Sequence, residues 1–152
     1  MSKSGVAYFN PPSAPPPQGM YSHVARTAPA ELAFIAGQVA IDAKGNPVGV
    51  GDFAAQVGPV FANLGNILKD LGADFEAVVQ FTTFLTSAED IAIWMKERAA
   101  LFPKLFPGGK YPPNTLLVVE RLVKPEFLLE VAAIARVGNE TRASPRRSAR
   151  GS

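Results

Sequence analysis

The spacing of apolar residues predicts two helices. After Asp52, apolar residues recur every three or four positions as far as Gly72, which predicts a helix capped by Asp52 and ended by the glycine. Pro59 lies inside this helix and should kink it. A second apolar row at helical spacing predicts a helix that Ser87 caps and that ends near Pro103.

Shorter apolar runs between turn-forming residues predict strands at 21–26, 32–36 with 39–41 continuing, 78–85, 115–121 and 127–136. The last two are separated by a short turn at Val123-Lys124-Pro125, so an antiparallel hairpin is expected there. The order is three strands, a helix, a strand, a helix and two strands. This order favours an α+β domain with a mainly antiparallel or mixed sheet and both helices on one face.

The last predicted strand carries a sign of self-association. Residues 127–135 read FLLEVAAIA, which is apolar on both faces of a strand rather than alternating. A strand of this kind needs cover on both sides, and two helices cover only one face of the sheet. We therefore expect another copy of the chain on the second face.

Composition narrows the class of protein. The chain has 152 residues, 47% of them hydrophobic and 18% charged, which suits one domain with a packed core. No apolar run approaches the ~20 residues of a membrane span. The chain has no cysteine, which excludes disulfides, thiolate catalysis and cysteine-bound metals. Because the first residues contain no apolar leader, a cytoplasmic location is expected.

The positive charge is concentrated at the C-terminus. The whole chain carries a net charge of +2, but the tail from Gly138 onward has four arginines and one glutamate, so residues 1–137 are close to neutral. A near-neutral domain argues against a nucleic-acid partner. The tail fits a solubilising end, with binding to an anionic surface or RNA as the alternative.

Several segments, in order, resemble the RidA family, also called YjgF or liver perchloric-acid-soluble protein. They are GMYSH at 19–23, FIAGQV at 34–39, AAQ at 54–56, NL at 63–64, residues 79–85 and LEVAAIA at 129–135. The resemblance covers residues 19–137, preceded by a Pro-rich extension at 1–18 and followed by the basic tail at 138–152.

The resemblance implies a chorismate-mutase-like fold, a homotrimer, and small-molecule pockets between subunits. It also implies hydrolysis of reactive enamines and imines, such as 2-aminoacrylate, to ketoacids and ammonia, with no cofactor and no metal. Some members of the family have been described as endoribonucleases.

One position departs from the family pattern. Active deaminases of the family have a Pro-Ala-Arg-(Ser/Thr) motif whose arginine holds the substrate carboxylate, and the matching stretch here is Pro112-Pro113-Asn114-Thr115. An arginine offers a permanent charge and a two-pronged donor, whereas an asparagine offers a neutral amide. We therefore expect the usual 2-imino acids to bind poorly, or a neutral ligand to be preferred.

Two residues are candidates for catalysis. Glu130 matches a family carboxylate near the catalytic water, and its alternative is a sheet-edge residue or the partner of an interface cation. Tyr21 matches a pocket tyrosine, and its alternative is half-buried packing. His23 is the single histidine, and its Ser-His-Val context is typical of a surface residue.

Four further residues are candidates for substrate binding. Asn114 would donate a hydrogen bond to the ligand, unless it only forms the turn after two prolines. Thr115 matches the Ser/Thr of the motif. Gly37 matches a glycine whose backbone approaches the ligand. Lys110, in the same loop, could supply the missing cation.

Three functions remain open. The first is an enamine or imine deaminase, a hydrolase of C=N bonds with an altered substrate. The second is a trimer that binds small molecules without turnover. The third is RNA cleavage, which rests on the family description and the basic tail.

Overall fold

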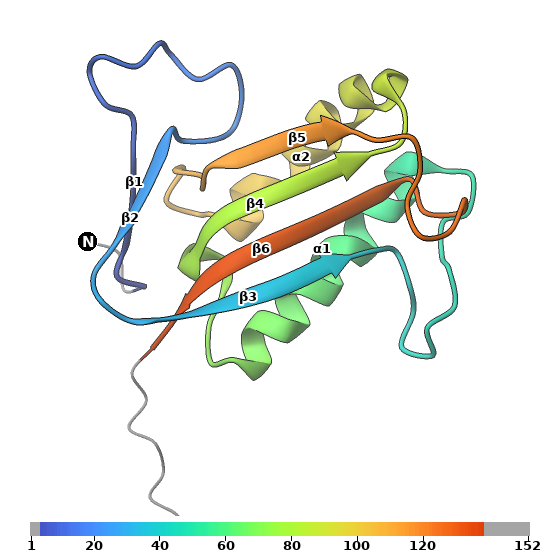
Figure 1. Ribbon diagram of the computed structural model, residues 1–152, viewed down its shortest axis with the longest axis horizontal. Helices are drawn as coiled ribbons and strands as arrows, with labels where there is room; N and C mark the ends of the chain where they lie inside the picture. The colour runs from blue at the N-terminus through green and yellow to red at the C-terminus, as the bar shows by residue number, and fades with distance from the viewer. Residues whose placement is uncertain (1–3, 139–152) are drawn as a thin grey trace, which may run out of the picture.

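The computed structural model describes residues 4–138, and they form a two-layer α+β arrangement (Figure 1). A four-stranded sheet in the order β3-β6-β4-β5 has both long helices on one face, and a small β1-β2 sheet lies at one side. The elements are β1 Val6–Phe9, β2 Val24–Thr27, β3 Glu31–Gln38, α1 Phe53–Asp70, η1 Phe75–Ala77, β4 Val78–Leu85, η2 Ala88–Asp90, α2 Ile91–Leu105, β5 Asn114–Val118 and β6 Leu129–Val137. The expected α+β class and the placement of the two helices are confirmed.

The first helix begins and ends as its sequence predicts. The Asp52 side chain accepts a hydrogen bond from the Ala55 N–H at 3.1 Å, and Gly72 follows the helix with φ +71°. The helix continues through Pro59. A proline frees the carbonyl four residues earlier, here that of Ala55, and this residue is exposed, so water can satisfy the carbonyl.

An aromatic cluster joins the helices to the sheet. Phe61 of α1 is its centre, with ring centroids 5.9 Å from Phe81 of β4 and from Trp94 of α2, and 5.6 Å from Phe102. All four side chains are buried. Large buried rings contribute much of the hydrophobic stabilisation of a domain of this size, so the core lies on the helix side of the sheet.

The predicted hairpin between the last two strands is wrong. β5 pairs in parallel with β4, and β6 lies between β3 and β4, antiparallel to both. The β4-α2-β5 segment is a crossover through a helix, which is the usual way to join parallel neighbours. β6 occupies an interior position with both edges hydrogen-bonded, and its helix-facing residues are buried while those on the other face are half-buried.

Smaller differences concern element boundaries. The first strand is 6–9, inside the segment assigned to the extension, and it pairs with β2, which is shorter than the predicted 21–26. Ser87 caps the short η2 turn that leads into α2. α2 runs past Pro103 to Leu105, because the carbonyl that Pro103 frees belongs to the exposed Ala99.

A buried glutamine ties two long loops to α1. Gln56 is fully buried, and its Nε2 donates to the carbonyls of Gly49 and Glu126 at 3.1 and 2.8 Å. Its Oε1 accepts the Leu128 N–H at 2.9 Å. These bonds fix the loop before α1 and the connection that leads into β6. No helix among the described residues is long and apolar enough to cross a membrane.

We predict that Gln56→Leu destabilises the protein by about 2–4 kcal/mol, because several buried backbone groups lose their partner. Urea unfolding at fixed protein concentration measures the change. Asn66→Leu is the control, since Asn66 lies exposed on the same helix. Equal stability of the two variants would contradict the proposed role of the Gln56 bonds.

Candidate functional site

The predicted site residues lie in two separate groups. Glu130 and Gly37 lie together where β6 begins and β3 ends, whereas Asn114 lies at the start of β5. Asn114 pairs with Phe81 in the middle of β4, whereas Glu130 pairs with Phe84 near the end of that strand, so the two groups lie apart along the sheet.

Glu130 lies on the face of the sheet that no helix covers. Along β6 the buried residues alternate with half-buried ones, and Glu130 pairs with the half-buried Phe84 of β4. A register shift between Ile35 and Gln38 places an irregularity of β3 beside it. A Cβ atom on Gly37 would overlap the Glu130 Oε1, so the carboxylate lies directly on the glycine backbone.

The surroundings of Glu130 favour its neutral form. Partial burial raises the pKa of the Glu130 carboxyl. Within residues 4–138 the carboxylate has no hydrogen-bond donor and no cation as a partner. A carboxyl in this state can both release and accept a proton at modest cost, which suits acid–base work.

Asn114 faces the other side of the sheet. It is the first residue of β5, and its Oδ1 accepts a 2.7 Å hydrogen bond from the hydroxyl of Thr83. Thr83 is 1% exposed and faces the helices, so the Asn114 side chain points into the helix layer. Because the Thr83 hydroxyl occupies the oxygen, the Asn114 NH₂ group is the part left to donate to a ligand.

One chain cannot place Glu130 and Asn114 on the same small ligand. Their strand partners on β4, Phe84 and Phe81, are three positions apart, which is about 10 Å along a strand. They also lie on strands either side of β4 and face opposite sides of the sheet. A ligand that touches both residue types must therefore lie between two copies of the chain.

Tyr21 belongs to the loop between β1 and β2. Its hydroxyl accepts the Gln18 N–H at 3.1 Å, and its ring meets that of His23 edge to face at 5.6 Å. The His23 Nε2 lies 2.6 Å from the carbonyl of Pro15. His23 is thus engaged in holding its own loop.

The remaining predicted residues are on the surface. Thr115 is exposed and pairs with Thr82 on the uncovered side of the sheet. Lys110 is exposed in the loop that leads from α2 to β5. Neither is brought against Glu130, since both lie on or beside β5.

Arg98 is a residue for which sequence analysis assigned no role. It lies on the buried face of α2 between Trp94 and Phe102, only 3% exposed, and close enough to Tyr21 for an electrostatic interaction. Its signal in the sequence is an arginine in the middle of an apolar row at helical spacing, where a charged residue is unusual.

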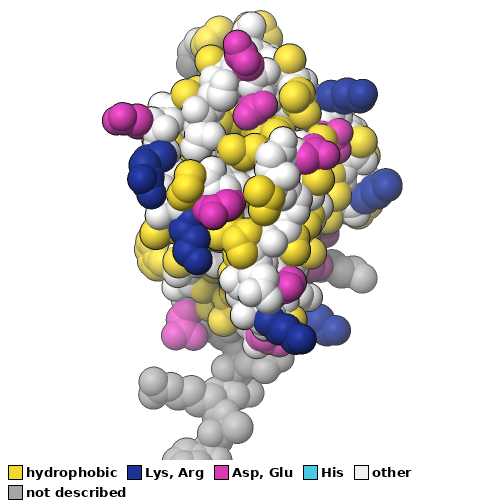
Figure 2. All heavy atoms as spheres, turned by 90° about the vertical axis from the view of Figure 1, so that its right-hand side faces the viewer, with side chains coloured by type: hydrophobic (Ala, Val, Ile, Leu, Met, Phe, Trp, Pro, Cys, Tyr) yellow, Lys and Arg dark blue, Asp and Glu magenta, His cyan; other side chains and the backbone are white. Residues whose placement is uncertain are grey.

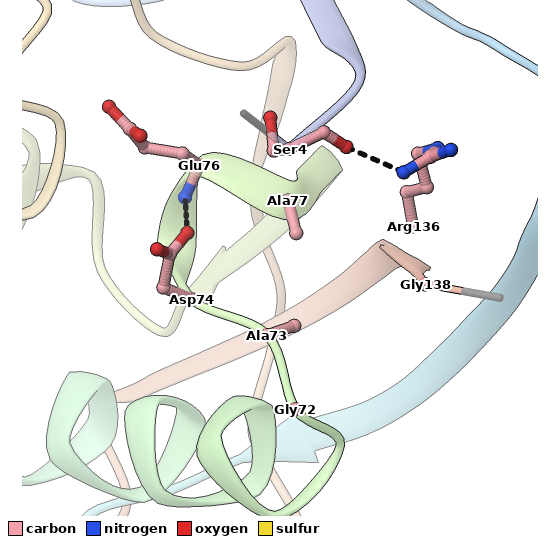
Figure 3. Close-up of a pocket in the computed structure, with 8 residues that line it drawn as sticks. All are labelled: Ser4, Gly72, Ala73, Asp74, Glu76, Ala77, Arg136 and Gly138. Carbon is pink, nitrogen blue, oxygen red and sulfur yellow. Dashed lines mark hydrogen bonds between the residues drawn. The ribbon is translucent and has the colours of Figure 1, made fainter. Parts of the chain in front are cut away.

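Two recesses lie away from these groups. One, of about 220 Å³, is on the uncovered face and is lined by Phe34, Ile35, Gln80, Thr82, Ala132, Ala133 and Ile134. The other, of about 350 Å³, lies between Ser4, the turn after α1 and the end of β6 (Figure 3). Two of its charged side chains have local partners, since Asp74 accepts a hydrogen bond from the Glu76 N–H at 2.9 Å and the Arg136 Nη1 donates to the Ser4 carbonyl at 2.8 Å.

The described residues hold no cluster of metal-ligating side chains, and charges of both signs share one face of the molecule. No group of three or more His, Cys, Asp or Glu residues within the described range could hold a metal ion. Figure 2 shows acidic and basic side chains interspersed with hydrophobic ones over the end of the molecule that lies at the right in Figure 1. The basic tail itself falls largely at 139–152, outside the described residues.

A family model and curated relatives match most of the length of the chain. The family model described as Endoribonuclease L-PSP matches residues 11–137. A RutC family protein of Pyrococcus horikoshii is 32% identical over 123 residues, which are 81% of this chain and 91% of that protein. A RutC family protein of Synechocystis is also 32% identical over 123 residues, or 80% of this chain and 89% of that protein.

Solved structures agree with the sequence comparison. YyfB of Yersinia pestis, described as a member of the conserved Rid protein family, superposes with a TM-score of 0.77 at 29% identity, covering 88% of this chain and 99% of that one. RidA of an Antarctic Psychrobacter gives a TM-score of 0.61 at 26% identity, covering 82% and 94%. The chain therefore belongs to the RidA/YjgF family, whose family model bears the description Endoribonuclease L-PSP.

Proposed function

We propose that this protein hydrolyses a small enamine or imine, without a cofactor, at a site completed between copies of the chain. The observation that carries the proposal is the Glu130 carboxyl. It is half-buried against Gly37 on the uncovered face of the sheet, its pKa is raised by burial, and no partner in the described chain occupies it.

The reaction needs little beyond proton transfer and positioning. An enamine takes a proton at carbon to become an imine, and water then adds to the C=N carbon. Glu130 would accept a proton from the attacking water and pass it to nitrogen, which gives a carbinolamine. It would then take the proton of the new hydroxyl group and pass it to nitrogen as well, so that the C–N bond breaks and ammonia leaves as the C=O bond forms. A carboxyl with a raised pKa performs both halves of this exchange, because each of its protonation states is accessible.

A second copy of the chain would supply the other half of the site. Asn114 and Tyr21 lie beyond the reach of Glu130 in the same chain, and the uncovered face needs cover because it carries the 75%-exposed Phe34 and an apolar recess. Glu130 and Gly37 of one copy would face Asn114 and Tyr21 of the next, as in the homotrimer that the family resemblance implies.

Binding without turnover is the second candidate. The observation that favours it is the Thr83 bond to Asn114, which commits the oxygen of that amide to the protein. The neutral group that remains is a weaker anchor than a guanidinium for a carboxylate. Such a protein would bind imines or ketoacids and release no ammonia.

RNA cleavage has less support from the described residues. The name of the family model suggests it. The single histidine is engaged with the Pro15 carbonyl, and charges of both signs alternate over the face in Figure 2. A nuclease that acts without a metal ion needs positioned acid and base groups and a basic surface.

We predict that Glu130→Gln lowers the kcat for ammonia release from a panel of fresh imines by about 10²- to 10⁴-fold, the usual contribution of an acid–base residue. Asn114→Arg, assayed in parallel, should increase turnover of 2-iminopropionate by supplying a charged anchor. Binding with no ammonia from the native protein on any imine would favour the second candidate instead.

The close approach of Gly37 gives a separate test. Gly37→Ala should reduce kcat by roughly 10²-fold or more. The new methyl group would occupy the position of the Glu130 carboxyl, and a displacement of that carboxyl by about 1 Å is enough for an effect of this size. Gly58→Ala is the matched control. Gly58 is exposed on α1 with no atom near its Cβ position, so that change should leave turnover intact and slightly raise stability.

The raised pKa of Glu130 also has a consequence for stability. Because folding penalises the ionised form, the native protein loses relative stability as pH rises through the folded-state pKa. Glu130→Gln removes this penalty. The Tm of the variant minus that of the native protein should be positive at about pH 8 and close to zero at about pH 4. A constant difference across this range would contradict the burial of the charge.

A further inference from the structure

Arg98 is a buried cation without a carboxylate partner in the described chain. Its side chain is 3% exposed, and its Cζ lies 5.7 Å from the ring centre of Trp94 and 5.8 Å from that of Phe102. The Nη2 contacts the Met95 sulfur at 3.0 Å, which is a weak acceptor, and the buried Nε has no acceptor. The neighbouring Trp94 Nε1 is also buried without one.

This arrangement is energetically unusual. A buried arginine is normally paired, because loss of hydration costs more than ring stacking returns. Burial lowers the pKa of Arg98, whereas the nearby Tyr21 raises it. A guanidinium kept in this state has one donor, the Nε, with no acceptor and another, the Nη2, with only a weak sulfur acceptor, and this points to an anionic ligand.

Arg98 and the Asn114 side chain lie on the same side of the sheet. The ring of Phe102, on which Arg98 stacks, is 6.1 Å from Phe81, the strand partner of Asn114, and 5.9 Å from Tyr111 in the preceding loop. The Asn114 side chain points into this same helix layer, as its bond to Thr83 shows. The helix thus brings a guanidinium to the side of the sheet that the Asn114 amide faces.

Arg98 also lies beneath the loop that carries Tyr21. A Cβ atom on Gly19 would come within 2.7 Å of the Arg98 Nη2, so the chain at Gly19 lies directly against the guanidinium. Two hydrogen bonds shape this cover, from the Gln18 N–H to the Tyr21 hydroxyl and from the Tyr21 N–H to the Gly19 carbonyl. Both are internal to residues 18–21, so they would persist if this segment moved to admit a ligand, whereas the packing of Met20 against the core would be lost.

We propose that Arg98 binds the carboxylate of a small ligand, through its Nε and Nη2 edge, under residues 19–21 and beside Asn114. The proposal rests on the proposed function and deepens it, because it names Arg98 as the residue that anchors the charged end of the ligand. A carboxylate accepts two parallel bonds from one edge of a guanidinium, and the free Nε and weakly engaged Nη2 form such an edge. The Asn114 amide would then hydrogen-bond the neutral end.

Trp94 makes the proposal measurable without turnover. It is the single tryptophan of the chain and stacks on Arg98, so its fluorescence should report a carboxylate bound there. The probes are propionate and, as a neutral isostere, propionamide at matched ionic strength. Propionate should give a saturable change in native protein, and propionamide none.

Variants separate the charge from the fold. Arg98→Met should weaken propionate binding, measured by calorimetry, at least about tenfold, and Arg98→Lys should give an intermediate value because it keeps the charge but loses the fork. Arg26→Met is the matched control, since Arg26 is exposed over the Phe9 ring and should leave binding unchanged. Adding Asn114→Arg to Arg98→Met should restore part of the affinity.

The outcomes distinguish this proposal from the proposed function. Equal responses to propionate and propionamide, or full affinity in folded Arg98→Met, would overturn the role of Arg98 even if ammonia release continues. A large fall in the Tm of Arg98→Met with unchanged propionate affinity would make Arg98 a structural residue. Arg98-dependent binding of propionate without turnover of any imine would retain the inference and reject the hydrolase.

Discussion

Two helices can cover only one face of a four-stranded sheet, and the rest of this structure follows from that limit. Phe61, Trp94 and Phe102 fill the space between the helices and the sheet, so the core is complete on that side. The other face keeps half-buried and exposed groups, including Phe34 and Glu130. That face is therefore available for a second copy of the chain and for chemistry.

The same limit divides the candidate site. Residues on β6 alternate between the core and the uncovered face, so Glu130 must lie on the opposite side from the helix-facing Asn114. The parallel β4-β5 pair also places Asn114 beside Phe81, three positions along β4 from Phe84, the partner of Glu130. A ligand could meet both groups only at a junction between copies, as the proposed function requires.

The candidate site has two halves, one around Glu130 and one around Asn114, and the charges of their side chains differ in a way that suits imino-acid chemistry. The half with Glu130 offers a carboxyl whose pKa is raised by burial, ready to exchange protons. The half with Asn114 offers a neutral amide on the strand and a buried guanidinium on α2. The guanidinium would then come from Arg98 on α2, whereas the family pattern has an arginine at the position of Asn114. The interaction offered to a carboxylate would be similar in both cases.

The sequence by itself determined the elements that depend on local periodicity and caps. Asp52 and Gly72 bounded α1 correctly because capping and positive φ are properties of short segments, and the two-helix count already implied an uncovered face. Strand pairing was decided only in the tertiary structure, where β6 inserts between β3 and β4 and the expected hairpin does not form. The role suggested for Arg98 could not be predicted from the sequence either. Helical spacing shows which face of the helix a residue occupies, but it does not show whether a carboxylate group lies next to that residue. Pairing and partners are long-range, and a pattern along one segment carries no information about the segment that will lie beside it.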